Sequence, residues 1–510
     1  MKIIKIVGLL IAILVVILFL SPLGSYILKP YAHDYLVKKA PKDIDIKLVN
    51  FNISLSTLKA DLIINNDIKM NLDGNFSPIS KKFDLKYIVQ AYRFKIGEHS
   101  IQDEINLKGK LIGNMDNFHI IGDGKALTSE VDYKFDLERQ KVKNLSLNMK
   151  KGNIAKLLNI LHQKSYSSGN FDMNLTTPIL NKKNIYADIN LSIKNAKVNE
   201  QLIYKEWEIE IPPKTTFQTK SQIQIEGGLI KFNTDINSSL GDLRLTKGNL
   251  YQVDQKNRLQ VHYYLHSKDT AALEPIIKRK IRGEIGVWGD ATYDNIWLLT
   301  GETRSFGGAI KFDIKDTILN AKIDQASLSH LFYFTYYPTI IDARVNGNLN
   351  YNIKEEDGIL HSKWEKIKFR RSGISEKIRK YTTIDLSKEL FTSATFEADV
   401  NRKLLNFDFK AQNSTSHLYL IDSMMNKIDN TIHARFDLGI RGQNLRGTIL
   451  GDINNPKIEL DIAKYIGDAI QEQIDTFISD ETKQQLKDGL KEYKNDDLGE
   501  SAKKIFNMFF

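Results

Sequence analysis

Along most of this chain, apolar and polar residues alternate one by one, which is the period of a β-strand with one buried face. The alternation dominates from about residue 43 to residue 460. It is clearest in four segments, which cover residues 131–137, 187–193, 405–411 and 434–440. Each such strand has its apolar side chains on one face and must bring that face against something apolar. The pattern therefore predicts a mainly β protein.

Three segments repeat one arrangement, in which a short apolar helix-like turn precedes an alternating strand marked by glycine. They cover Lys151–Thr177, Lys268–Tyr293 and Asp324–Ile353. Such self-similarity indicates an array built by stacking one supersecondary unit. No linker rich in proline, glycine or serine divides the body of the chain, which favours one continuous architecture.

Alternation alone leaves open what the apolar face of each strand contacts. One interpretation is a second sheet, which would make a β-sandwich or several barrels. The other is a curled sheet whose inner face lines an open groove for acyl chains. Few long amphipathic helices are present to cover a sheet, so helices do not offer a third solution. Without further information the pattern favours the sandwich.

The amino-terminal segment 1–28 is predicted to be a membrane anchor. Two lysines precede an uninterrupted apolar run from Ile6 to Leu20. A cleaved signal peptide and an uncleaved transmembrane helix are both compatible with this run, and the lack of a clean small-x-small cleavage site favours the helix. Long polar domains are exported with little regard to charge, so we expect the body outside the inner membrane. The anchoring residues are Ile6, Leu10, Leu14 and Leu18.

After Pro456 the period changes to that of a helix. Isoleucines recur every four residues from Ile466 to Ile478, which predicts amphipathic helices within 461–510. One interpretation is that these helices cover the terminal edge strand of the sheet, and the pattern favours it. The other is a contact with a membrane or a partner protein, made by the aromatic residues at the end of the chain, Phe506, Phe509 and Phe510.

Composition narrows the function further. With 510 residues, the chain is too long for one compact core, so several domains or one elongated array are expected. The formal net charge is +10 but no run of five or six basic residues occurs, which argues against nucleic-acid binding. The most basic stretch, Ser362–Lys388, is either a solvated loop, which we favour, or a contact with anionic head groups. The absence of cysteine excludes disulfides and thiolate nucleophiles.

Catalytic signatures are absent from the sequence. It contains no phosphate-binding Gly-x-x-x-x-Gly-Lys motif, no Gly-x-Ser-x-Gly and no His-Glu-x-x-His. His262 and His266 share a strand face, but no third ligand follows at a suitable spacing, so a solvated pair is favoured over a metal site. We therefore predict a protein that is not an enzyme and that needs no cofactor or metal.

The end of the alternating region carries a family resemblance. In the run Gly442–Ile458, a strand bounded by glycines leads into Gly451 and then Pro456, with the apolar Ile458 two positions after the proline. Together with the repeated units, the amino-terminal anchor and the Leu-Leu turn before Ser167–Asp172, this run resembles the AsmA-like family of bacterial inner-membrane proteins. In that family such a stretch closes the β region ahead of the terminal helices.

The resemblance implies an elongated, curled, groove-like sheet of degenerate repeats over residues 29–460, and it raises the groove above the sandwich. It also implies a single-pass inner-membrane protein with its body in the periplasm, which carries phospholipid toward the outer membrane or takes part in outer-membrane biogenesis. Acyl chains would slide along the apolar face while head groups stay in water. The candidate lining residues are Ile189, Leu191, Ile193, Val345, Leu349, Phe407, Phe409, Phe436 and Leu438.

A second function is compatible with the same pattern. A scaffold or assembly chaperone for envelope proteins would use exposed strand edges and the phenylalanine-rich end of the chain. The lipid-transfer hypothesis names phospholipid, the inner membrane and a periplasmic or outer-membrane protein as partners. The scaffold hypothesis expects protein partners and no bound lipid.

Overall fold

The structure is a computed structural model of the chain. It describes residues 22–39, 44–77, 80–96, 99–114, 116–139, 141–180, 185–253, 256–372, 375–376, 378–379, 384–453 and 455–461. Strands take up 66% of the chain, in agreement with the mainly β prediction. The chain divides into two compact units, and each is described by itself. The first holds the described residues up to Ala321 and Leu331–Tyr337, and the second holds Lys322–His330 and the described residues from Pro338 onward.

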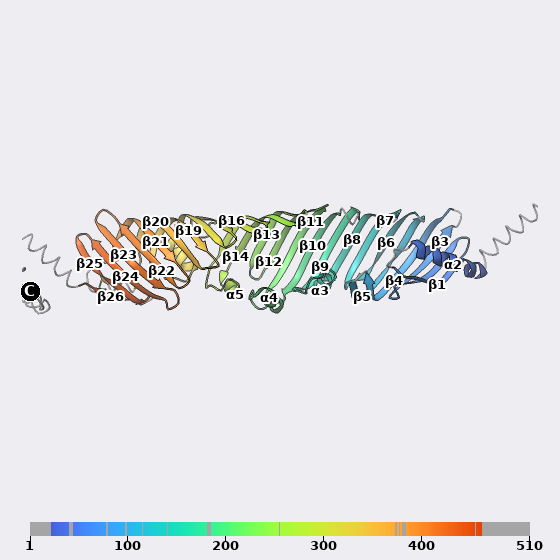
Figure 1. The fold of residues 1–510 in the computed structure, drawn as a ribbon, viewed down its shortest axis with the longest axis horizontal. Helices are drawn as coiled ribbons and strands as arrows, with labels where there is room; N and C mark the ends of the chain where they lie inside the picture. Colours follow the sequence, from blue (N-terminus) through green and yellow to red (C-terminus); the bar gives the residue numbers. More distant parts are fainter. Residues whose placement is uncertain are drawn as a thin grey trace, which may run out of the picture. The chain divides into compact units, whose positions relative to one another are not determined.

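The first unit is a meander in which each strand pairs antiparallel with the next along the chain (Figure 1). Its strands are β1 (Ile46–Ile53), β2 (Thr57–Ile64), β3 (Ile68–Ser77), β4 (Lys82–Ile96), β5 (His99–Asn114), β6 (Asn117–Ala126), β7 (Ser129–Glu138), β8 (Lys141–Asn153), β9 (Ser167–Ile179), β10 (Tyr186–Val198), β11 (Thr216–Glu226), β12 (Leu229–Ser238), β13 (Gly241–Val253), β14 (Lys256–Ser267), β15 (Ile285–Asp294), β16 (Ile296–Thr303) and β17 (Ala309–Lys315).

The second unit has the same antiparallel meander. Its strands are β19 (Ile341–Asn352), β20 (Asp357–Phe369), β21 (Leu390–Val400), β22 (Leu404–Gln412), β23 (Ser416–Asn426), β24 (Thr431–Ile440), β25 (Gln443–Asp452) and β26 (Lys457–Leu460). The remaining strand, β18 (Ile318–Ser327), contributes residues to both units. Within each unit the described strands form a curled, open antiparallel sheet, so the sandwich that alternation favours is not what they form.

Most short helices lie in connections that follow even-numbered strands. Because the strands are antiparallel, these connections all lie at the same end of the strands, as Figure 1 shows for α3, α4 and α5. Three of them precede β9, β15 and β19, at the positions of the three turn-and-strand segments singled out in the sequence. The connecting elements are α3 (Ile154–Ile160), α4 (Glu200–Trp207), η1 (Thr270–Leu273), α5 (Glu274–Ile277), α6 (Leu328–Phe334) and η2 (Leu386–Lys388). Of these, α4 and η2 were not predicted.

The first described helix, α2 (Pro22–Lys39), corrects the start of the β body. Residues 29–39 are helical, whereas the prediction assigned them to the sheet. Their apolar residues are spaced by four rather than two, and Ala32 and Leu36 pack on the cluster formed by Leu48, Ala60 and Leu62.

The predicted amino-terminal anchor and the predicted carboxy-terminal helices lie mainly outside the described residues. Among the described helices, none combines the length and the apolar character that a bilayer crossing needs. The anchoring residues Ile6, Leu10, Leu14 and Leu18 lie outside the described residues, as do residues 462–510 with Phe506, Phe509 and Phe510.

The described part of the basic stretch Ser362–Lys388 differs from the solvated loop that the sequence favours. Its first part is the end of β20, and beyond the strand the Arg370 guanidinium donates two hydrogen bonds of 2.7 Å to the Asp342 carboxylate. Ile384 and Leu386 are buried. The described part of this stretch is therefore packed against the sheet rather than solvated throughout.

Single residues with positive φ form bulges inside several strands and bend them. Lys151, Lys247, Gln325 and Asp422 have φ of 57°, 52°, 52° and 49°. A bulged N–H leaves the ladder and needs another acceptor. In all four cases the acceptor is the side-chain oxygen of an Asn or Asp on the neighbouring strand, at 2.9 to 3.1 Å, in the pairs Lys151–Asp172, Lys247–Asn233, Gln325–Asn346 and Asp422–Asp408.

The bulge at Lys151 makes stability depend on pH. The backbone N–H of Lys151 and the ammonium of Lys194, 3.0 Å from the carboxylate, hold the pKa of Asp172 below its usual value. A lowered folded-state pKa stabilises the fold above the unfolded-state pKa of about 3.9, and that contribution is lost as pH falls through the folded pKa. We expect Asp172→Ala to reduce the free energy of unfolding by about 1 kcal/mol at pH 6 and by less near pH 3.

Urea unfolding of the first unit at the two pH values measures this difference. Asp172→Asn is the matched control, because its amide oxygen can still accept the Lys151 hydrogen bond, as Asn233 and Asn346 do at two other bulges. A loss for Asp172→Ala that is the same at both pH values would contradict a role for the charged carboxylate.

Candidate functional site

The candidate site is the apolar face of the sheet. Residues directly opposite each other on paired strands share a face. In the first unit, one such row takes a residue from every strand between β1 and β17, and we call it the central row. It consists of Leu48, Leu62, Met70, Val89, Leu107, Gly124, Val131, Met149, Met173, Leu191, Ser221, Thr234, Leu245, Tyr263, Gly289, Gly301 and Phe312.

The structure brings the three lining residues predicted in this unit together. Leu191 belongs to the central row, and Ile189 and Ile193 lie on β10 two positions to either side of it, on the same face. Ile189 is opposite Leu175 and Ile223, and so begins a neighbouring apolar row. Ile189, Leu191 and Ile193 are all half-buried. Their apolar surface is therefore not closed off by a second layer of protein.

The central row has three hydroxyl-bearing residues. Tyr263 donates a hydrogen bond of 3.0 Å to the Thr300 carbonyl oxygen, and Ser221 and Thr234 bond to each other. The Thr234 hydroxyl donates a hydrogen bond of 3.1 Å to the Ser221 hydroxyl, across β11 and β12. A polar pair that is internally hydrogen-bonded costs less in an apolar environment than two unpaired groups. The row therefore stays largely apolar in character at these strands.

One rim of this face is closed by α3. Ile154 of the helix is buried with Phe171 and Ala196, which are 1% and 0% exposed. In addition, the Lys156 ammonium of α3 contacts the Asp103 carboxylate of β5, which is 7% exposed. The helix α3 follows β8, so β6, β7 and β8 lie between it and β5 along the chain. An ion pair between α3 and β5 therefore requires the sheet to curl strongly.

The second unit differs in how fully its apolar face is packed. Its own central row is buried throughout, with exposures of 8% or less, and consists of Val345, Trp364, Ala394, Ala411, Leu418, Leu438 and Leu445. Of the predicted lining residues, Val345 and Leu438 are in this row. Phe409 and Phe436, in the next row, are also buried, at 3% and 5% exposure. Only Leu349 and Phe407, one row further, are half-buried.

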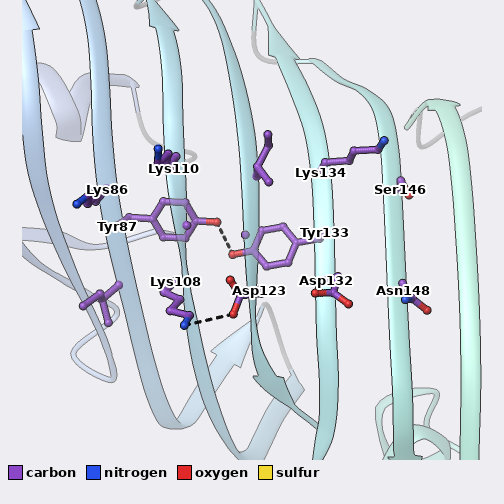
Figure 2. A pocket seen from close by; sticks show the side chains of 14 residues that line it. Lys86, Tyr87, Lys108, Lys110, Asp123, Asp132, Tyr133, Lys134, Ser146 and Asn148 are labelled. Carbon is purple, nitrogen blue, oxygen red and sulfur yellow. Dashed lines mark hydrogen bonds and ion pairs between the residues drawn. The ribbon is translucent and has the colours of Figure 1, made fainter.

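Aromatic rings that lie over glycines form much of the apolar face. Tyr87 of β4, Gly109, Gly122 and Tyr133 of β7 are successive partners across four strands. The two tyrosine hydroxyls form a hydrogen bond with each other, as Figure 2 shows. A Cβ on Gly122 would lie 2.3 Å from the Tyr87 hydroxyl, so the rings occupy the space that side chains would take. Burial raises the pKa of both tyrosines, which keeps them neutral.

The same pairing recurs along both sheets. A Cβ would come within 2.4 to 2.8 Å of an aromatic ring at four further glycines, in the pairs Gly152–Phe171, Gly248–Phe232, Gly301–Phe312 and Gly447–Phe436. A ring lying flat across a neighbouring strand covers two strands with one apolar surface. Sequence reasoning missed these pairs, although a glycine inside an alternating strand signals a close approach.

The two histidines that the sequence singles out are both paired with carboxylates. His262 and His266 share the polar face of β14, and their rings contact the carboxylates of Asp290 and Glu284 respectively. Among the described residues, no group of three or more possible ligands is placed to hold a metal ion.

Comparison of the chain with protein-family models, with curated proteins and with solved structures gave no match. The AsmA-like resemblance therefore stays a prediction that depends on the residues given above. The chemistry that the described geometry offers is a partly exposed apolar row that crosses the strands of the first unit.

The close approach at glycine gives a direct test of this packing. A Cβ on Gly289 would lie 1.9 Å from the Thr300 carbonyl oxygen, and backbone cannot easily move away. We expect Gly289→Ala to lower the free energy of unfolding by about 1–3 kcal/mol. Gly286→Ala, in the same strand, meets nothing closer than 3.9 Å and is expected to be neutral. Equal losses in urea unfolding for the two variants would contradict the packing of β15 against β16.

Proposed function

We propose that this protein is a lipid-transfer protein of the bacterial envelope, in which phospholipid acyl chains bind along the apolar face of the sheet. The observation that carries the proposal is the central row of the first unit, where residues such as Met173 and Leu191 remain half-buried. Apolar side chains that keep accessible surface gain free energy when hydrocarbon covers them, by about 0.8 kcal/mol for each CH₂ removed from water.

The geometry supports movement along the sheet as well as binding. The row crosses the strands, so equivalent apolar positions recur about every 4.8 Å. Neighbouring positions differ little in polarity, because the Ser221 and Thr234 hydroxyls bond to each other. An acyl chain would therefore meet no large step in free energy between one strand and the next, and its head group would stay in water.

The cellular part of the proposal rests on the sequence. The apolar segment 1–28 supplies the inner-membrane anchor, and the body would extend into the periplasm. The AsmA-like resemblance adds a role in outer-membrane biogenesis, with a periplasmic or outer-membrane protein as partner.

Photocrosslinking along β10 tests the proposal position by position. We expect a photoreactive residue at Ile189, Leu191 or Ile193 to label phospholipid in membranes, because these side chains lie on the apolar face. The same residue at the exposed Asn190 is the matched control, since it lies one position away on the opposite face. Lipid labelling from Asn190 as strong as from Leu191 would defeat the proposal, and labelling of proteins alone would favour the scaffold function.

A charge on the central row should block lipid binding. We expect Leu191→Glu to lower the amount of phospholipid that co-purifies with the protein by about tenfold, since a carboxylate among acyl chains is costly. Asn190→Glu adds the same charge to the polar face and should leave lipid retention unchanged. Mass spectrometry of retained lipid, with circular dichroism to confirm folding, measures both. Unchanged retention in folded Leu191→Glu would be evidence against the apolar face as the binding surface.

A further inference from the structure

A hollow of about 720 Å³ lies against strands β4 to β8 of the first unit, on the residues that Figure 2 draws. Most of its lining residues belong to the polar register of these strands, opposite to that of Tyr87 and Tyr133. Four of them are lysines: Lys86, Lys108, Lys110 and Lys134. The polar face is thus concave where lysine side chains of β4, β5 and β7 lie close together.

The strand register lines up three of the lysines. Lys86 of β4 is directly opposite Lys110 of β5, and Lys110 is followed across the sheet by Ile121 and then by Lys134 of β7. Like charges directly opposite each other destabilise a sheet. Within the part of the chain that the structure describes, none of these three lysines forms an ion pair. Asp73 of β3 is directly opposite Lys86, but its carboxylate lies 3.1 Å from the Lys59 ammonium and is paired with that lysine. The lysine row is therefore not neutralised by ion pairs of its own, because the carboxylate opposite Lys86 is already paired with Lys59.

The carboxylates of the hollow lie in a separate row. Two residues along each strand, Lys108 is opposite Asp123, and Asp123 is opposite Asp132. Lys108 already forms an ion pair with Asp123, with 3.5 Å between its ammonium and the carboxylate. The acidic row is thus partly neutralised within the protein, while the lysine row is not.

Other groups complete the lysine row. The Ser146 side chain of β8 lies opposite Lys134 and ends the row with a hydroxyl. Gly109 and Gly122 contribute only backbone to the hollow, because they carry no side chains. Ile121, which is 47% exposed, lies between Lys110 and Lys134. A ligand with an anionic group and a small apolar part would match this lining.

We propose that the row of Lys86, Lys110 and Lys134 binds a phosphate-bearing anion on the polar face. Lysine binds phosphate as a point charge, and a bound phosphate would relieve the repulsion between Lys86 and Lys110. The volume of 720 Å³ has room for a phosphate group together with the small molecule or head group that carries it. The site lies on the face opposite to the central row, so it stands independently of acyl-chain binding.

Equilibrium dialysis of the full chain with radiolabelled inorganic phosphate tests the site. We expect saturable binding that weakens about tenfold or more in the triple variant Lys86→Gln/Lys110→Gln/Lys134→Gln. The control variant Lys363→Gln/Lys403→Gln/Lys410→Gln removes the same charge from exposed lysines of the second unit and should bind as the wild type does. Asp132→Asn removes a carboxylate beside Lys134 and should tighten binding about twofold.

Vesicle flotation separates the two sources of phosphate. Vesicles of phosphatidylcholine, with and without phosphatidylglycerol, are compared for the wild type and for the two triple variants. Binding of free phosphate that depends on the lysine row supports a soluble ligand, and flotation with phosphatidylglycerol that depends on the same row supports a lipid head group. If neither assay distinguishes the lysine-row variant from the control variant, or if Asp132→Asn weakens binding, the proposal is overturned.

The two proposals fail separately. Loss of the lysine row is expected to leave phospholipid retention on the apolar face unchanged, whereas Leu191→Glu should leave phosphate binding unchanged. The lysine-row variant is also expected to unfold in urea no more easily than the wild type, because it removes a repulsive pair rather than a packed side chain.

Discussion

The structure depends on one constraint, which is that apolar residues of successive antiparallel strands stay in register on one face. Because direct partners share a face, a row such as Met149, Met173 and Leu191 continues from strand to strand without a break. A one-residue slip would move a strand's whole apolar set to water. In this protein no second sheet takes up the apolar face among the described strands, so curvature and flat aromatic rings have to cover it. The Tyr87 and Tyr133 rings over Gly109 and Gly122 show how this is done.

The two units differ in how far the side chains of their apolar faces are buried. In the second unit, large aromatic residues fill the face: the Trp364 ring lies 5.2 Å from Phe396 and 5.0 Å from Phe409, between ring centroids. Its central row is accordingly buried. In the first unit the corresponding positions are mostly aliphatic and half-buried, with closure concentrated at the rim where α3 packs on Phe171. Partial exposure of aliphatic side chains is a cost in water that hydrocarbon would remove, which is why the proposed function is argued from the first unit.

The polar face has its own organisation. Several charged side chains there pair with opposite charges on neighbouring strands, as in the Arg244–Asp235 pair at 2.8 Å. In the part of the chain that the structure describes, the lysine row of β4, β5 and β7 has no such pair. Lys86 and Lys110 are directly opposite each other beside a hollow in the sheet, and Asp73, on the other side of Lys86, is paired with Lys59. A sheet with one apolar and one polar face can therefore carry two kinds of ligand, one on each side.

The sequence by itself determined the β class, the face on which each side chain lies and the position of several helical connections. These follow from local periods of two and of about four residues, which is why Ile189, Leu191 and Ile193 were placed on one face. Whether a second sheet covers that face, how far Val345 and Phe409 are buried, and which lysines meet were decided by the tertiary structure. Those outcomes depend on pairing register and curvature between strands far apart in the chain, such as β4 and β7, and a local pattern contains neither.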